Sequence, residues 1–286
     1  MFQPELWYLL PTSVVIATIA MSSGIGGAVF FAPLFILVLQ LEPTVAIGAA
    51  LITELFGFSS GLIAYGRQGL IDYHVGRMLL MLSIPFAIAG SLGADRVPSD
   101  ILKGIFAGGI IFIGIQLFLS FRNERRERLE GTGEDEISEN HESELIDRDG
   151  NVFRYTVCAP VRGAAFAAIG GALLGMISVG LAELQEYRLV ALCRLPAPVA
   201  VATSIFVVVI TVAFASFVHI YRFATDADPA ALQQVASVVV FTVPGVVIGG
   251  QLGPLLQRRV DPEIMKVAIA GLFILVGGFM FWTLGA

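Results

Sequence analysis

Two acidic residues lie in stretches of the chain that are otherwise apolar. Glu54 sits in the middle of the run 43–66, which has no other charge, and Glu183 follows a stretch of small residues. A carboxylate in such surroundings is costly unless it is neutralised or paired, and for this reason it often marks a proton or ion pathway. We predict that both acids carry a coupled proton. The alternatives are a permanently protonated hydrogen-bond donor for Glu54 and a position at an aqueous mouth for Glu183.

Small residues interrupt two apolar stretches and predict two bends. A glycine inside a helix costs about 1 kcal/mol, so a helix unwinds where several occur together. The helix that follows a break begins with unpaired N–H groups and about half a positive charge, and it can bind an anion without lysine or arginine. Close packing of helices through small residues is the alternative. The predicted anion-binding residues are Ser22, Ser23, Gly24, Gly26, Gly27, Ser178 and Gly180.

Two further hydroxyls belong to the predicted anion-binding set. Thr203 and Ser204 lie near the start of a later apolar run. Each hydroxyl could contact a substrate, or it could bond to a carbonyl of its own helix. We predict no metal site, because the three histidines are far apart in the sequence and none has a carboxylate at ligand spacing on a helix. His219, near the end of its apolar run, is interpreted as an interfacial residue.

The composition places these residues in a membrane protein. Of the 286 residues 56% are hydrophobic and 14% are charged, against about 25% charged in an average soluble domain. The charges concentrate between residues 122 and 154, so the remaining chain could not cover the surface of a soluble globule. No basic patch indicates nucleic acid, and no cluster of catalytic side chains indicates an enzyme.

The apolar runs predict about 8–10 membrane segments, since a spanning helix needs about 20 residues. The run 6–41 is too long for one span, and we interpret it as a hairpin of two broken or short helices that bends at 22–28. Further spans are predicted at 43–66, 78–94, 104–121, 163–182, 195–221, 232–256 and 267–286, with a short amphipathic piece at 189–195.

The second half of the chain repeats the first. Residues 45–50 match 199–204 at a spacing of 154, and Gly-Ser-Leu-Gly at 90–93 matches Gly-Gln-Leu-Gly at 250–253. We predict an all-α polytopic membrane protein with two repeats, 1–121 and 157–286, each made of a broken-helix hairpin and three transmembrane helices. The charged segment 122–156 has almost no apolar content and is expected to be a solvated linker that cannot form a core. A regulatory or partner-binding role for it is the alternative.

The arginines predict how the repeats lie in the membrane. The cluster at 122–128 is expected in the cytoplasm by the positive-inside rule. Counting the spans outward from it places both termini outside and gives the two repeats opposite orientations. Inverted repeats with broken helices are common in secondary transporters, which bind their substrates near the bilayer midplane.

The same residues resemble a known family. The bend Ser23-Gly24-Ile25-Gly26-Gly27, Pro33 after it and Gly69-Leu70-Ile71-Asp72 before the third span are similar to the TauE/SafE family of sulfite and organosulfur-anion exporters. The second bend, Ser178-Val179-Gly180, has one glycine where members often carry a glycine cluster.

The resemblance implies a function. It implies a secondary transporter that moves sulfite or an organosulfonate across the plasma membrane, coupled to an ion gradient, for which we predict protons. We expect as partners a small sulfur-containing anion and the lipid bilayer, with a homodimer as an option, and neither nucleic acid nor a cofactor. The alternative is a membrane-embedded subunit, or an enzyme, that acts with a partner complex.

Overall fold

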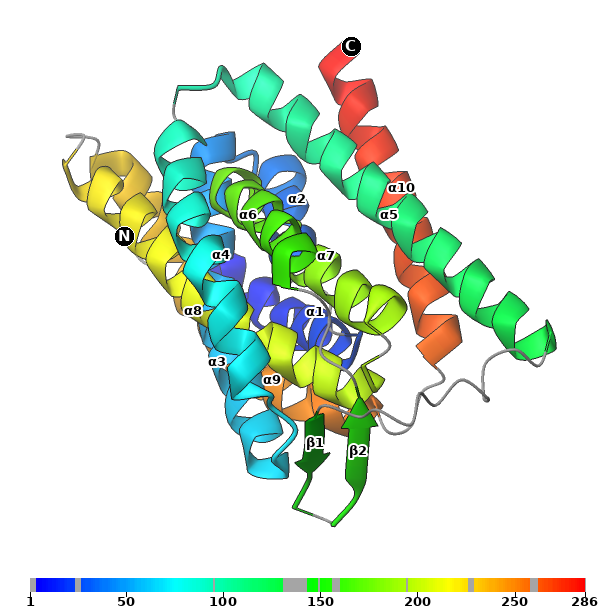
Figure 1. Ribbon diagram of the computed structural model, residues 1–286. Helices are drawn as coiled ribbons and strands as arrows, with labels where there is room; N and C mark the ends of the chain where they lie inside the picture. Colours follow the sequence, from blue (N-terminus) through cyan, green and yellow to red (C-terminus); the bar gives the residue numbers. More distant parts are fainter. Residues whose placement is uncertain are drawn as a thin grey trace.

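Two successive sets of helices in the same order make up the protein (Figure 1). The computed structural model describes residues 4–23, 27–94, 96–130, 143–148, 150–155, 160–193, 195–225, 229–257 and 262–285. After a 3₁₀ turn, η1 (Pro4–Tyr8), the first set consists of α1 (Leu9–Ser23), α2 (Ala28–Pro33), η2 (Leu34–Val38), α3 (Pro43–Gln68), α4 (Tyr73–Ala94) and α5 (Ser99–Glu130). The second consists of α6 (Pro160–Ile177), α7 (Leu181–Tyr187), η3 (Arg188–Leu192), α8 (Ala197–Thr225), α9 (Pro229–Gln257) and α10 (Pro262–Gly285).

The helices confirm the polytopic all-α membrane fold. Among the described residues, six helices are long and apolar enough to cross a bilayer, and three shorter apolar helices accompany them. The predicted bend in the run 6–41 is confirmed, because α1 ends at Ser23 and α2 begins at Ala28. The predicted span 163–182 was too long, since α6 ends at Ile177 and the chain bends before α7.

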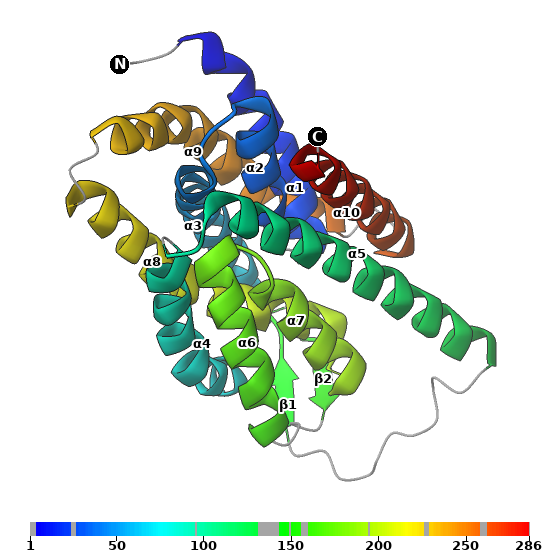
Figure 2. The same ribbon diagram turned by 90° about the horizontal axis from the view of Figure 1, so that it is seen from above.

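Equivalent helices of the two sets make equivalent contacts with the other set. The helix α1 packs along α9, and its counterpart α6 packs along α4 (Figures 1 and 2). Likewise α3 contacts α9 while α8 contacts α4, and the pairs α3 with α8 and α5 with α10 join equivalent helices. The opposite orientation of the two repeats in the membrane remains a prediction.

Glycines allow the closest of these approaches. A Cβ at Gly249 would lie 2.6 Å from the carbonyl oxygen of Val14, and one at Gly171 would lie 2.5 Å from that of Ser83. Side chains at these positions would push α9 away from α1 and α6 away from α4. This is the small-residue packing that membrane helices use where burial from water gives no driving force.

The charged segment contains structure that the sequence analysis did not predict. The helix α5 continues to Glu130, and the strands β1 (Ser143–Ile146) and β2 (Val152–Tyr155) form an antiparallel hairpin. The hairpin packs on the turn between α3 and α4, where the Arg148 N–H donates to the carbonyl oxygen of Gln68 at 3.1 Å. The expected linker thus contains a hairpin that docks on the helices, although Tyr155 is the one buried residue among its described positions. The hairpin could not be predicted from composition, because two four-residue strands contribute too few apolar residues to stand out in a highly charged segment.

Tyr155 fixes the hairpin to the helices. Its ring is buried, and its hydroxyl donates to Asp72 Oδ2 at 2.8 Å, while Asp72 Oδ1 accepts the N–H groups of His74 and Val75 at the start of α4. Burial and the neighbouring Asp72 carboxylate raise the pKa of Tyr155, so the phenol stays protonated and remains a donor. The carboxylate of Asp72 thus joins the hairpin to the N-terminus of α4.

We expect Tyr155→Phe to lower the free energy of unfolding by about 1.5–3 kcal/mol, the typical contribution of a hydrogen bond to a charged group. Thermal unfolding of the purified protein in detergent measures it. Tyr73→Phe is the matched control, because the Tyr73 ring is exposed and its hydroxyl has no hydrogen-bond partner among the described residues. Equal melting temperatures for the two variants would contradict the docking.

Deleting 131–142 should leave transport intact, whereas deleting 143–155 should not.

The predicted orientation is tested by labelling single cysteines at positions 2, 135 and 286 in a background without Cys158 and Cys193. An impermeant maleimide should label positions 2 and 286 in intact cells, and position 135 only after the cells are opened. Cys193 is disulfide-bonded, and removing it breaks this bond. The background protein must therefore first elute from a size-exclusion column at the same volume as the wild-type protein. Labelling of position 135 from outside would contradict the orientation.

Candidate functional site

The short helices that follow the two predicted bends continue in the same way. The short helices α2 and α7 each continue into a five-residue π-helix, which closes with the Leu39 N–H on the Leu34 carbonyl in one copy and the Cys193 N–H on the Arg188 carbonyl in the other. Arg188 and Cys193 lie 154 positions after Leu34 and Leu39, respectively. The sequence repeat is therefore also a repeat of backbone hydrogen bonds.

Equivalent side chains hold the helices that lead into the bends. The Tyr65 hydroxyl donates to the Met21 carbonyl at 3.1 Å, and His219 Nε2 lies 3.1 Å from the Gly175 carbonyl. These pairs also occupy positions 154 apart. The interpretation of His219 as an interfacial residue is wrong, because its side chain is buried and bonded inside the bundle. Its partner lies 44 positions earlier, where a single-sequence pattern does not reveal it.

A carboxylate occupies the N-terminus of α2. Glu54 reaches across from α3, and its Oε1 accepts the N–H of Ala28 at 3.4 Å and also the N–H of Gly27. The side chain is buried. Glu54 therefore binds, with its own carboxyl oxygen, N–H groups at the bend that was predicted to hold an anion.

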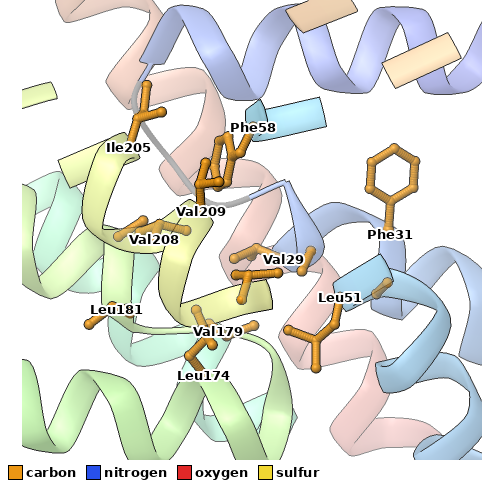
Figure 3. Close-up of a cluster of buried hydrophobic side chains, with 14 of the residues drawn as sticks. Val29, Phe31, Leu51, Phe58, Leu174, Val179, Leu181, Ile205, Val208 and Val209 are labelled. Carbon is orange, nitrogen blue, oxygen red and sulfur yellow. The ribbon is translucent and has the colours of Figure 1, made fainter. Parts of the chain in front are cut away.

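A second carboxylate occupies the N-terminus of α7. Glu183 Oε2 accepts the N–H of Gly180 at 3.0 Å, and the charge of Glu183 lies close enough to interact with that of Glu54. The two acids are not at equivalent positions, because valine occupies the counterpart of each: Val208 for Glu54 and Val29 for Glu183. Figure 3 shows these valines in a buried apolar cluster with Val179 of the second bend. Each bend thus has one carboxylate, supplied by a different helix.

The second bend has an unusual backbone. Ser178 has a φ of 56° and Gly180 a φ of 109°. A left-handed conformation is uncommon for a residue other than glycine, and such conformations cluster at functional sites. Ser178 stands where the first copy has Gly24.

Buried polar atoms at the second bend and on α3, α7 and α8 have no hydrogen-bond partner among the described residues. They include Glu54 Oε2, the hydroxyls of Ser178 and Ser204, and both amide atoms of Gln185. Buried polar groups are nearly always bonded, so these atoms have capacity left for a ligand or water. Gln185 was not among the predicted residues. Aligning the two copies reveals it, since the amide stands where the first copy has Phe31.

The predicted site residues divide into groups. Ser22 and Ser23 donate their hydroxyls to carbonyls of their own helix, at 2.8 and 2.9 Å from Ile19. Thr203 Oγ1 accepts the Asp72 N–H at 3.0 Å, so it ties α8 to the turn before α4. Gly24 and Gly26 lie outside the described residues. The structure places Gly27 and Gly180 against the two carboxylates, Glu54 and Glu183 respectively.

Comparisons with known proteins agree with the resemblance seen in the sequence. The family model described as "Sulfite exporter TauE/SafE" matches residues 9–280. A similar protein is the "Probable membrane transporter protein YunE" of Bacillus subtilis (strain 168), which is 26% identical over 279 residues, 94% of each chain. No solved structure matches.

Proposed function

Since the chain belongs to the sulfite exporter TauE/SafE family and is a membrane transporter, we propose that it moves sulfite or an organosulfonate across the plasma membrane by proton-coupled secondary transport. The observation that carries the proposal is the position of Glu54, whose carboxylate binds the N–H groups at the start of α2. Those groups are suited to a small oxyanion.

Competition for these N–H groups couples the proton to the anion. When Glu54 is ionised, its carboxylate occupies the donors and repels a second anion. When Glu54 is protonated, it accepts these bonds more weakly and no longer repels, so an oxyanion can replace it at the helix end. A proton and an anion therefore bind together and leave together.

The second bend completes the site. Glu183 occupies the N-terminus of α7 as Glu54 occupies that of α2, and the two negative charges disfavour each other. Protonation of either acid relieves this repulsion and prepares the site for an anion. Ser178, Ser204 and Gln185 supply neutral hydrogen-bonding groups without a fixed positive charge. Neutral donors bind an anion less tightly than arginines do, which allows release on the other side.

Flux into proteoliposomes tests this function. We expect saturable uptake of radiolabelled methanesulfonate by liposomes that contain the purified protein, with competition by sulfite but not by chloride. Empty liposomes and liposomes with the Gly180→Val variant are the controls. Uptake no greater than that of empty liposomes, for methanesulfonate and for labelled sulfite, would contradict the proposed substrate class.

A further inference from the structure

A cavity of about 470 Å³ lies at the end of the bundle opposite the hairpin. Its wall is formed by the start of α3, the turn between α4 and α5, and the last turns of α8. The helix α3 begins at this cavity and ends at Gln68, where the hairpin docks. Its volume is within the range typical of small-ligand sites. By the predicted orientation, the cavity opens on the outer face.

The side chains that line the cavity suit an oxyanion. Arg96 and Arg222 line it beside the buried His219, and Glu42 is the one acid among the described lining residues. Arg222 Nη1 donates to the carbonyl oxygen of Leu92 at 3.1 Å, which fixes its guanidinium. The Arg96 guanidinium makes no ion pair or hydrogen bond with the part of the chain that the structure describes. Guanidinium groups bind planar and tetrahedral oxyanions through paired N–H donors.

Two long helices begin at the same cavity. Thr44 and Val45 lie in the first turn of α3, before the first bond of that helix, which the Ala46 N–H makes to Glu42. Ser99 begins α5, whose first bond is from the Leu102 N–H to Pro98. Helix N-termini carry about half a positive charge each. The two helix N-termini and the two guanidinium groups therefore contribute potential of the same positive sign, opposed by Glu42 among the described lining residues.

The cavity is separate from the two carboxylates at the bends. Val45 and Glu54 are nine residues apart on one helix, which is about 13 Å along its axis. Phe223 lines the cavity and packs so closely on α3 that a Cβ at Gly48 would lie 2.5 Å from its ring. This ring therefore packs on α3 at Gly48, which lies between Val45 and Glu54 along the helix.

The face on which the β-hairpin docks has no aromatic ring at the position equivalent to Phe223. The counterpart of Phe223 is Gly69, 154 positions earlier. Asp147 and Arg148 of the hairpin lie against Gly69, within 3.7 Å of where its Cβ would be. The hairpin thus covers, on the predicted inner face, the position whose counterpart lines the outer cavity.

We propose that this cavity is a second oxyanion-binding site, a vestibule for a sulfonate or phosphate group on the outer face. The group comes either from the free substrate, in which case the site extends the proposed transport function, or from the head of an anionic lipid. The two guanidinium groups bind the oxygens of the ligand, and the N-termini of α3 and α5 add to the potential.

Residue-specific modification of arginines tests the site without requiring transport. The protein in phosphatidylcholine nanodiscs is treated with phenylglyoxal, with methanesulfonate or with chloride at equal ionic strength, and modified peptides are quantified by mass spectrometry. We expect methanesulfonate to slow the modification of Arg96 and Arg222 at least threefold. Arg67 and Arg77, exposed near the other face, should be unaffected.

The same experiment in nanodiscs of an anionic lipid identifies the source of the bound oxyanion group. Protection of Arg96 and Arg222 by phosphatidylglycerol nanodiscs, without methanesulfonate, would assign the site to a lipid phosphate. Protection by neither agent, or equal slowing at all four arginines, would overturn the proposal. Because this readout needs no flux, it stands even if the proposed transport function fails.

Flux then tests whether the free substrate uses the vestibule. Arg96→Gln should raise the KM for methanesulfonate uptake from the outer side about three- to tenfold with the maximal rate unchanged. Arg77→Gln is the matched control and should leave both values unchanged. An unchanged KM for Arg96→Gln would overturn the assignment to free substrate.

Discussion

Glu54→Gln should transport the anion but lose the dependence of accumulation on a pH gradient. With one proton carried per anion, a gradient of one pH unit changes the accumulation ratio of the wild-type protein about tenfold, since 1.4 kcal/mol is a factor of ten. Glutamine keeps an oxygen that can accept the Gly27 and Ala28 N–H groups, but it cannot ionise. It therefore imitates the protonated acid in every state, and its accumulation ratio should not change with the gradient.

The measurement is methanesulfonate accumulation in proteoliposomes at a series of imposed pH gradients. Glu5→Gln is the matched control, because Glu5 is exposed in the turn before α1, and it should keep the wild-type slope. A wild-type slope in Glu54→Gln would move the coupling to Glu183 or end the hypothesis. Glu183→Gln, measured in parallel, separates these two results.

Gly180→Val should abolish transport in a protein that still folds. The φ of 109° at Gly180 is one that a β-branched residue hardly adopts, and its Cβ would lie 3.2 Å from the Leu173 side chain. Strain of this kind costs about 1–3 kcal/mol and displaces the N–H group that Glu183 accepts. We expect methanesulfonate flux to fall at least tenfold when normalised to protein that elutes as a single peak.

The matched control for this prediction is Gly278→Val on α10, where a Cβ would meet nothing within 4 Å. Flux in the Gly278 variant should stay near that of the wild type. Gly26→Val, at the equivalent position of the first bend, is expected to act as Gly180→Val does. Normal flux in Gly180→Val would show that the geometry of the second bend is not needed.

The helices and their breaks could be predicted from the sequence because their causes are local. Pro43 begins α3 directly after Glu42, which ends the uncharged run 6–41, and the cluster of glycine and serine stops α1 at Ser23. The 154-residue repeat predicted the two bends together, and both structural bends occur at equivalent positions. Local propensity and the absence of charge were sufficient for this part of the fold.

The partners of the site residues could not be predicted, because they are distant in the sequence. The bond between Thr203 and Asp72 joins residues 131 positions apart, and Glu54 reaches Ala28 across 26. The sequence indicated an anion site at the first bend and an acid at Glu54, but not that the acid occupies the anion site. The proposed competition between the carboxylate and an anion rests on the packing of Glu54 against the start of α2.

The central claim, that a proton and an anion are carried together, is tested most directly by following the pH inside proteoliposomes with an enclosed pH-sensitive dye. Methanesulfonate is the appropriate probe because it is the anion of a strong acid and carries no proton of its own. With the membrane potential clamped, addition of methanesulfonate outside should acidify the interior of wild-type vesicles but not of vesicles with Glu54→Gln. Uptake of radiolabelled methanesulfonate by the wild-type protein without internal acidification would contradict the account.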